Sequence, residues 1–177
     1  MTNNNLKTDF LKSSDATDLF RSAYENRYTW SSDFKGYKGK CIFQSNNNEI
    51  SGTFLISSDF KYSLNGVEDD YASKAISSQL WEISIHRVRR SFEDTHKDNT
   101  FRKGLSNSEG IEILVGGRSN GDKYKVRDNI ITFVHRNIHG SFVNIHTKST
   151  INTGFGYLST KYTSQYIDIS TGKPKSA

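Results

Sequence analysis

The sequence predicts an α+β fold, in which a curved antiparallel β-sheet or partly open β-barrel of about eight strands packs on a long helix. Five or six strand-like runs follow Gly110, and two or three more precede Gly66. A long segment rich in helix formers separates the two groups. Because short turn signals and not helical crossovers join neighbouring runs, the strands should be antiparallel.

The length and the composition favour one folded domain. The chain has 177 residues, of which 12% are aromatic, and this is atypical of a disordered chain. We expect a single α+β domain over residues 13–170. The ends, 1–12 and 171–177, should be flexible because they are polar and show no periodicity.

An amphipathic helix of about three turns should begin near Ser14, which is a suitable N-cap. Its apolar residues follow helical spacing, and they are Ala16, Leu19, Phe20, Ala23 and Tyr24. Further along, the apolar runs 39–44 and 49–57 are joined by the polar tract 45–48, which predicts a hairpin, and a third strand follows at 60–64.

The long helix should run from about Asp69 to Phe92, and it is apolar on two sides. One side holds Ala72, Ala75, Ile76, Leu80 and Ile83, and the other holds Trp81, Ile85, Val88 and Phe92. Because neither stripe belongs in water, we expect a sheet to cover one side and a different element to cover the other. A kink near Trp81 is the alternative.

After Gly110 the chain should form a meander, with turn signals at 116–121, 128–129, 138–140 and 152–154. If the turn at 138–140 pairs Asn137 with Ser141, then His135 and His146 lie on opposite faces of the sheet. A one-residue change of register would bring the two histidines together. On the first register we expect no metal site.

The net charge of +5 permits an acidic partner without demanding one. The single cysteine, Cys41, excludes an intrachain disulfide and a multi-thiolate zinc site, which favours a reducing, cytoplasmic compartment. No apolar run approaches the roughly 18 residues that a membrane span needs. The nucleic-acid signal is weak, because Lys123 and Tyr124 should project to opposite faces of their strand.

Candidate site residues gather on the long helix. Glu82 and His86 are four residues apart and could act as general acid and base, although an ordinary helix-surface pair is much the more common finding. Arg87 and Arg90 fall on the stripe that begins apolar, so at least one of them needs an anionic ligand or an internal carboxylate. The carboxylates considered are Glu93, Asp94 and Glu112. The expected ligand- or partner-binding set is Trp81, His86, Arg87, Arg90 and Tyr157, with the cofactor unknown.

Several segments resemble an uncharacterised family that occurs mainly in cyanobacteria and plastid-bearing organisms and is known only as a domain of unknown function. The most specific segment is QLWEISIHRVRRSF, and the others are GIEILVGG, GDKYKVRDN, HRNIHG and GYLSTKYTSQY. The resemblance runs from about Arg27 to Gly172. It implies a soluble protein of a phototroph, with a role around photosynthetic pigment, lipid or complex assembly, and it supplies no catalytic residue.

We therefore expect a non-enzymatic binding or assembly module, which holds a pigment- or lipid-like ligand in the concavity of the sheet through aromatic side chains and an arginine. Two alternatives stay open. The chain could be an assembly factor whose basic helix meets an acidic protein surface, or an enzyme that acts on a small hydrophobic substrate with Glu82 and His86 as acid and base.

Overall fold

The computed structural model describes residues 15–138 and 140–175, and its fold is α+β. These residues form two compact units, of which the smaller is Thr29–Arg89 and the larger holds the remainder. The helices are α2 (Ala16–Glu25), α3 (Asp70–His86) and α4 (Phe92–His96). The strands are β1 (Tyr37–Ser45), β2 (Asn48–Ile56), β3 (Tyr62–Asn65), β4 (Asn99–Asn107), β5 (Gly110–Gly117), β6 (Lys123–Arg127), β7 (Ile130–Ile138), β8 (Ser141–Asn152) and β9 (Tyr157–Asp168).

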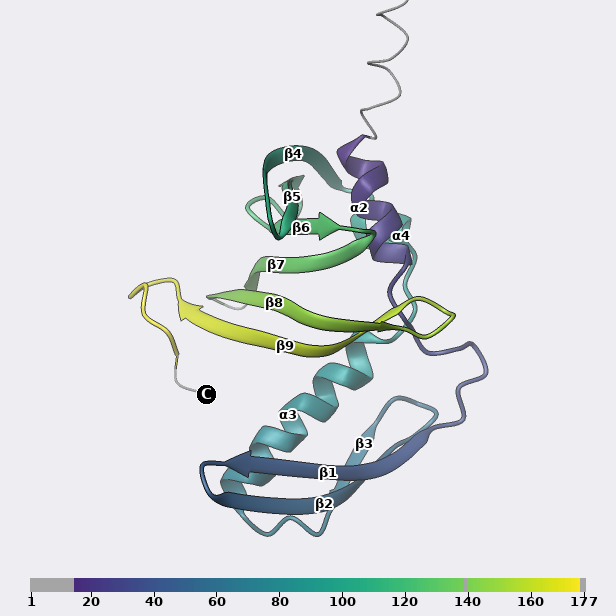
Figure 1. Cartoon of the computed structure of the whole chain (residues 1–177), viewed down its shortest axis with the longest axis vertical. Helices are drawn as coiled ribbons and strands as arrows, with labels where there is room; N and C mark the ends of the chain where they lie inside the picture. The colour runs from purple at the N-terminus through teal and green to yellow at the C-terminus, as the bar shows by residue number, and fades with distance from the viewer. Residues whose placement is uncertain (1–14, 139, 176–177) are drawn as a thin grey trace, which may run out of the picture. The chain divides into compact units, whose positions relative to one another are not determined.

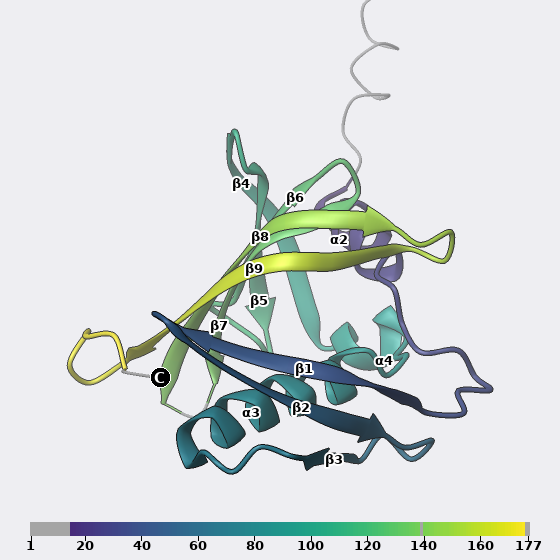
Figure 2. The ribbon, with the colours of Figure 1, turned by 60° about the horizontal axis from the view of Figure 1, so that its bottom comes forward.

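The larger unit contains a six-stranded sheet in the order β4-β5-β6-β7-β8-β9. Every neighbouring pair is antiparallel, so the sheet is a simple meander. Figure 2 shows how strongly these strands twist. The antiparallel connections that the turn signals predict are therefore confirmed for this part of the chain.

Helix α2 packs against β4, β6 and β7 and supplies the centre of the core (Figure 1). The Phe20 ring lies 4.4 Å from that of Tyr124 between ring centroids and 5.9 Å from that of Phe92 in α4. The buried cluster consists of Ala16, Phe20, Ala23, Tyr24, Phe92, Ile113, Val115, Tyr124, Val126 and Ile131. Thus the apolar spacing read from the sequence does form the buried face of α2.

The start of α2 differs by one residue from the expected one. The Asp15 carboxylate accepts a hydrogen bond from the Thr17 amide at 3.3 Å and caps the helix. Ser14, the expected cap, and the expected flexible segment 1–12 lie outside the described residues. At the other end, Lys175 donates from its amide to the Tyr166 carbonyl at 2.8 Å and from Nζ to Ser141 Oγ at 2.7 Å, while 176–177 are not described.

The smaller unit is a three-stranded antiparallel sheet, β1-β2-β3, with α3 packed against it (Figure 2). Its buried apolar residues are few, namely Trp30, Ile56, Ala72, Ile76 and Leu80. The Trp30 indole donates to the Ser84 carbonyl of α3 at 3.3 Å, which fixes the ring against the helix.

The expectation of one sheet of about eight strands is wrong. The described residues contain nine strands, which divide into the two sheets above, and neither sheet closes into a barrel. The division falls at α3, because each strand pairs only with neighbours on its own side of that helix. Local periodicity identifies strands, but it carries no information on which strands pair across a long helix.

The long helix is also shorter than expected, since α3 ends at His86 and not at Phe92. The carbonyl of Arg87 accepts a hydrogen bond from the Trp30 amide at 2.7 Å. Ser91 then caps α4, with its hydroxyl accepting from the Asp94 amide at 3.0 Å. Ser91 is therefore the N-cap of a second helix, at a position where we expected the interior of one long helix. No helix within 15–138 or 140–175 is long and apolar enough to cross a membrane.

Burial on both sides of α3 is only partly observed. Leu80 is 4% exposed, in agreement with the expected core stripe. Trp81 on the opposite stripe is 51% exposed, so its expected burial is wrong. Ile83, Ile85 and Val88 are half-buried. Because the helix breaks within two turns of Trp81, the second stripe is too short to demand a covering element.

Candidate functional site

The pairing of β7 with β8 determines which side chains share a face. Ile138 pairs with Ser141, so the expected pairing of Asn137 with Ser141 is wrong by one residue. The connection holds only two residues, and the second, Gly140, has φ +78°, as tight hairpins require.

This register brings two of the five histidines together on one face. His135 pairs with Asn144, and Phe133 pairs with His146. Because residues two apart on a strand point to the same side, His135 and His146 share the side that carries Phe133. The expectation that the two histidines occupy opposite faces is therefore wrong.

The shared side is the one turned away from α2. On β6, β7 and β8, its residues alternate with side chains that are buried on the α2 side, such as Tyr124, Val126, Ile131 and Val143. We call this side of the sheet the outer face. Its central residues are Lys125, Phe133, His135, Phe142, Asn144 and His146.

A carboxylate links two of the cationic or titratable groups of the outer face. Glu109, in the turn between β4 and β5, has one oxygen 2.6 Å from Lys125 Nζ and the other 3.1 Å from His146 Nδ1. The hydrogen bond from Lys125 holds the pKa of the Glu109 carboxyl below its ordinary value, against the opposing effect of burial, and His146 acts in the same direction as Lys125. Lys125 is only 17% exposed, so its charge is largely committed to Glu109.

Each histidine also contacts a phenylalanine ring. The rings of Phe133 and His146 lie 4.7 Å apart between centroids, and those of His135 and Phe142 lie 5.0 Å apart and nearly parallel at 25°. All four side chains are half-buried. The outer face therefore presents two aromatic–imidazole pairs in place of the charged surface that usually covers a solvent-facing sheet.

The hydrogen bonds of the imidazoles fix where their protons lie. His135 Nδ1 is 2.6 Å from the side-chain oxygen of Asn144, and His146 Nδ1 faces the Glu109 carboxylate. An oxygen acceptor at Nδ1 places the proton of a neutral ring on that atom. Nε2 of each ring is then an acceptor that can bind a ligand or take up a proton.

A β-bulge ends the outer face on one side. Ile131 pairs with Val126 and Phe133 with Lys125, so Thr132 has no partner on β6. The Thr132 hydroxyl lies within hydrogen-bond distance of the backbone carbonyls of Glu109, at 2.5 Å, and of Lys125, at 3.1 Å. The bulge thus holds the turn that carries Glu109 against the sheet.

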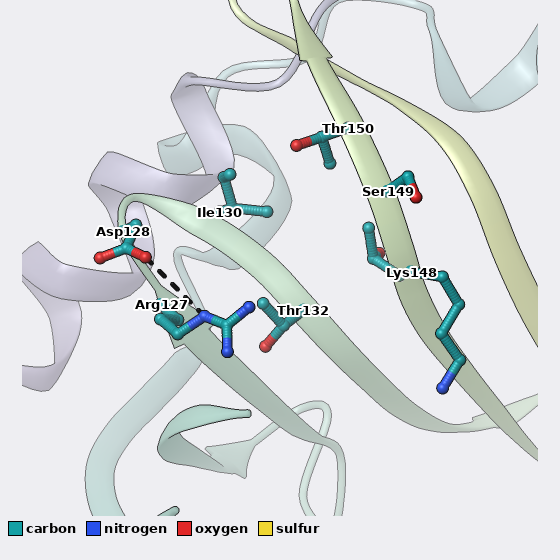
Figure 3. Close-up of a pocket in the computed structure, with 8 residues that line it drawn as sticks. Arg127, Asp128, Ile130, Thr132, Lys148, Ser149 and Thr150 are labelled. Carbon is teal, nitrogen blue, oxygen red and sulfur yellow. Dashed lines mark ion pairs between the residues drawn. The ribbon is translucent and has the colours of Figure 1, made fainter. Parts of the chain in front are cut away.

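Beyond Phe133 and His146, β7 and β8 no longer pair, and a small notch lies between them. Its volume is about 80 Å³. Figure 3 shows Arg127 and Thr132 on one side of the notch, and Lys148, Ser149 and Thr150 along β8 on the other. The full lining is Arg127, Asp128, Ile130, Thr132, Thr147, Lys148, Ser149 and Thr150.

The notch has the donors that an anion requires. The Arg127 guanidinium lies beside Thr132, and Lys148 adds a second positive charge on β8, although its ammonium group points away from Arg127 (Figure 3). The lining also includes four hydroxyl side chains. Asp128 lies 3.8 Å from Arg127 Nε, and another guanidinium nitrogen donates to the Ser108 carbonyl. The guanidinium is thereby oriented, and its charge is only partly offset.

A second hollow occurs in the smaller unit, at the end of the β1–β2 hairpin. It is wider, about 470 Å³, and it is lined by Phe43, Ser45, Asn46, Asn47, Asn48, Ile50, Asp69 and Tyr71. Its only charged lining residue is Asp69, which already caps α3 by accepting from the Ala72 amide at 2.7 Å. This hollow is therefore unsuited to an anion.

The candidate acid–base pair on the helix does form. Glu82 and His86 lie 2.6 Å apart on α3, and the His86 side chain is 61% exposed. Trp81 lies beside them in the sequence and is exposed as well. Such an arrangement is that of a helix-surface pair, and a catalytic role for it stays a prediction.

The two arginines behave differently from each other. The Arg87 guanidinium lies over the Trp30 ring, 5.2 Å from its centroid, whereas Arg90 is exposed. The carboxylates considered as internal partners have other contacts. Glu93 pairs with Arg21, Asp94 contacts Ser91, and Glu112 accepts from the Leu105 amide.

Tyr157, the remaining expected ligand-binding residue, lies in the larger unit at the start of β9. Its hydroxyl accepts a hydrogen bond from the Ile131 amide at 3.2 Å, in the region where β7 and β8 separate. Burial raises the pKa of Tyr157 above its ordinary value. These contacts are those of a structural residue, because the Tyr157 hydroxyl supplies the acceptor for the Ile131 amide at a point where β7 no longer pairs with β8.

Sequence reasoning missed the residues that make up the outer face and the notch, chiefly Glu109, Phe133, Phe142, Arg127 and Lys148. The outer face could have been found from the alternation of residues in β7 and β8, if the register had been shifted by one residue so that His135 and His146 share a face. No group of three or more His, Cys, Asp or Glu side chains in the described ranges could hold a metal ion.

Comparisons with known proteins agree with the resemblance noted in the sequence. No curated protein and no solved structure matches the chain. A family model described as "Protein of unknown function (DUF3386)" matches residues 11–177. Since that match spans nearly the whole chain, the protein belongs to this family.

Proposed function

We propose that the chain is a non-enzymatic binding module whose ligand carries an anionic group together with flat rings. The binding surface consists of the outer face and the notch. One observation carries the proposal: a notch lined by Arg127 and Lys148 begins one residue beyond the ring pair of Phe133 and His146. A single ligand can therefore meet both features.

The notch selects the anionic group. Arginine, lysine and hydroxyl side chains together are the usual donors to phosphate and carboxylate oxygens. A volume of about 80 Å³ holds one small group of this kind and excludes the remainder of the ligand. The remainder would then lie on the outer face, where the four rings offer apolar, polarisable contacts.

The concavity that the sequence suggested is a less suitable site. On the α2 side, β4–β7 are covered by the aromatic core that Phe20, Phe92 and Tyr124 form. A pigment or lipid of a phototroph stays a proposal for the identity of the ligand. Such a molecule would bind with its anionic group in the notch.

An enzyme is the second candidate, because Glu109 orients His146. A carboxylate at Nδ1 leaves Nε2 as a general base, the arrangement that many hydrolytic sites use. On α3, Glu82 contacts His86 at Nε2, which leaves Nδ1 of that ring instead. The third candidate is an assembly factor that meets an acidic protein through Arg87 and Arg90. Turnover of a bound ester by the wild type but not by His146→Gln would favour the enzyme.

Phenyl phosphate, which carries one ring and one anion, tests the proposed function. In ¹⁵N-labelled full-length protein, we expect its amide shifts to change at Arg127, Lys148 and Phe133. Arg127→Ala removes a charged donor worth roughly 1.5–3 kcal/mol, so binding should weaken by about tenfold or more. Arg118→Ala is the matched control, because Arg118 is exposed in the turn before β6, at the strand end opposite Arg127. Unchanged spectra at millimolar phenyl phosphate would contradict the proposal.

A further inference from the structure

We infer that the ligand of the outer face is a single-stranded nucleic acid. This inference rests on the proposed function and names its ligand class. It follows from the openness of the surface, the spacing of the rings, the free hydrogen-bonding groups and the placement of the cations.

The geometry favours a polymer over a small molecule. Small ligands bind in concave sites that enclose most of their surface. The notch holds a single anionic group, and the ring pairs lie beside it on the sheet with half-buried side chains. A ligand that fills the notch and also covers both ring pairs must extend along β7 and β8 for several residues.

The rings form two successive stacking positions. Phe133 and His135 are two residues apart on β7, which is about 7 Å along the strand. Each contacts a ring from β8, His146 in the first case and Phe142 in the second. Aromatic side chains at repeated positions on a sheet are the platform on which unpaired bases stack.

The side chains beside the rings can contact the edges of bases. Nε2 of His135 and of His146 is an acceptor, as derived above from their Nδ1 partners. The Asn144 oxygen is bound to His135, which leaves the two amide hydrogens of Asn144 as donors. Unpaired bases present complementary donors and acceptors on their exposed edges.

Three cations border this track and can meet phosphates. Lys123 is exposed and pairs with His135 across β6 and β7, while Arg127 and Lys148 line the notch. Lys125 is excluded, because its ammonium group is bound to Glu109. Glu112 on β5 pairs with Lys125 and adds a negative charge there, so the track runs over β6–β8 and not toward β5.

The nucleic-acid signal in the sequence is weak because the basic and aromatic residues of this face lie on different strands. On β6, Tyr124 does point to the core and away from Lys123. The rings that accompany Lys123 come from β7 and β8, and the observed register places them on the same face.

Fluorescence anisotropy with labelled oligonucleotides tests the inference on the full chain. The probes are a twelve-residue oligouridylate, a twelve-residue oligothymidylate, a DNA duplex of that length and inorganic polyphosphate as competitor. Single strands should bind, and log K should fall with log salt at a slope of about −2, since three phosphate contacts contribute about 0.7 each. Each of Lys123→Ala, Arg127→Ala and Lys148→Ala should reduce that slope by about 0.7.

Substitution of the rings separates stacking from charge attraction. Phe133→Leu and Phe142→Leu keep apolar volume and remove the ring, so affinity should drop about tenfold with no change of the salt slope. Tyr37→Leu, which removes an exposed ring of the smaller unit, should leave binding unchanged. Circular dichroism of each variant verifies that it is folded.

The inference is overturned by equal binding of the duplex, by equally effective competition by polyphosphate, or by unchanged affinity of both phenylalanine variants. If phenyl phosphate binds in the notch while neither oligonucleotide binds more tightly than phenyl phosphate does, the inference fails and the proposed function stands. If phenyl phosphate does not bind either, both fail.

Discussion

The side-chain amide of Asn99 lies 3.1 Å from Nδ1 of His96, so the neutral His96 ring carries its proton on Nε2. The rings of Phe20, Tyr24 and Phe92 lie 5.0 to 5.3 Å from this imidazole between centroids. Burial lowers the pKa of His96 to about 4, and the positive charges of two arginines act in the same direction. The core of the larger unit therefore contains a histidine that resists protonation.

We expect this histidine to make the fold sensitive to acid. Below pH 6.5 the unfolded chain binds a proton at His96, whereas the folded chain does not until pH falls to about 4. Stability should therefore decrease as pH falls through this range, by about 3 kcal/mol. Urea melts at pH 7 and 4.5 measure the loss. His96→Gln, which cannot titrate, should show a smaller loss, and an equal loss in both proteins would contradict the prediction.

Tyr157 should be a structural residue. Tyr157→Phe leaves the Ile131 amide without its acceptor in a buried position, which costs about 1–3 kcal/mol of unfolding free energy. Tyr37→Phe is the matched control, because Tyr37 is 57% exposed, and its effect should stay below about 0.5 kcal/mol. Loss of phenyl phosphate binding by Tyr157→Phe at full stability would show that Tyr157 is a ligand residue after all.

Substitutions in the two apolar stripes of α3 should lower the free energy of unfolding by different amounts. Leu80→Ala removes a side chain that is 4% exposed, and the resulting cavity should cost about 2–5 kcal/mol. Trp81→Ala removes a larger but half-exposed side chain, so its cost should be clearly smaller. Urea melts followed by far-ultraviolet circular dichroism compare the two variants. A larger loss for Trp81→Ala would restore the expectation that both sides of the helix are covered.

Substitution of each of the two arginines after α3 should also have a different effect on stability. Arg87→Ala loses the contact over the Trp30 ring and should cost about 0.5–2 kcal/mol. Arg90→Ala changes an exposed side chain and should stay within about 0.5 kcal/mol of the wild type. Melting temperatures at low and high salt provide the comparison. Equal destabilisation by both substitutions would mean that Arg90 has an internal partner.

Local sequence patterns encode the periodicity of single helices and strands. In β5, the alternation of Ile111, Ile113 and Val115 correctly predicts which side chains face the core. The end of α3 was missed because Ser91 is as compatible with a helix interior as with a cap until its neighbours are placed. Pairing between strands far apart in the sequence has no local signal, so the two sheets could not be separated in advance.

Prediction of the candidate site depended on placing the pairing of β7 with β8 correctly to within one residue. With Asn137 opposite Ser141, His135 and His146 diverge, and with Ile138 opposite Ser141 they converge. Periodicity cannot distinguish these pairings, because both place alternating residues on alternating faces. The role of Glu109 was also hidden, since the turn that carries it is fixed by contacts with Thr132 on a distant strand.

The smaller unit should not unfold independently of the rest of the chain, as the expected single domain over 13–170 requires. Its buried apolar residues are few, and cores of that size seldom sustain a stable fold alone. Both tryptophans, Trp30 and Trp81, lie in this unit, so tryptophan fluorescence reports on it alone. Circular dichroism reports on both units, because it sums the signals of α3 in the smaller unit and of the helices and strands in the larger one. Urea transitions followed by the two probes should coincide, and an earlier fluorescence transition would divide the chain into two domains.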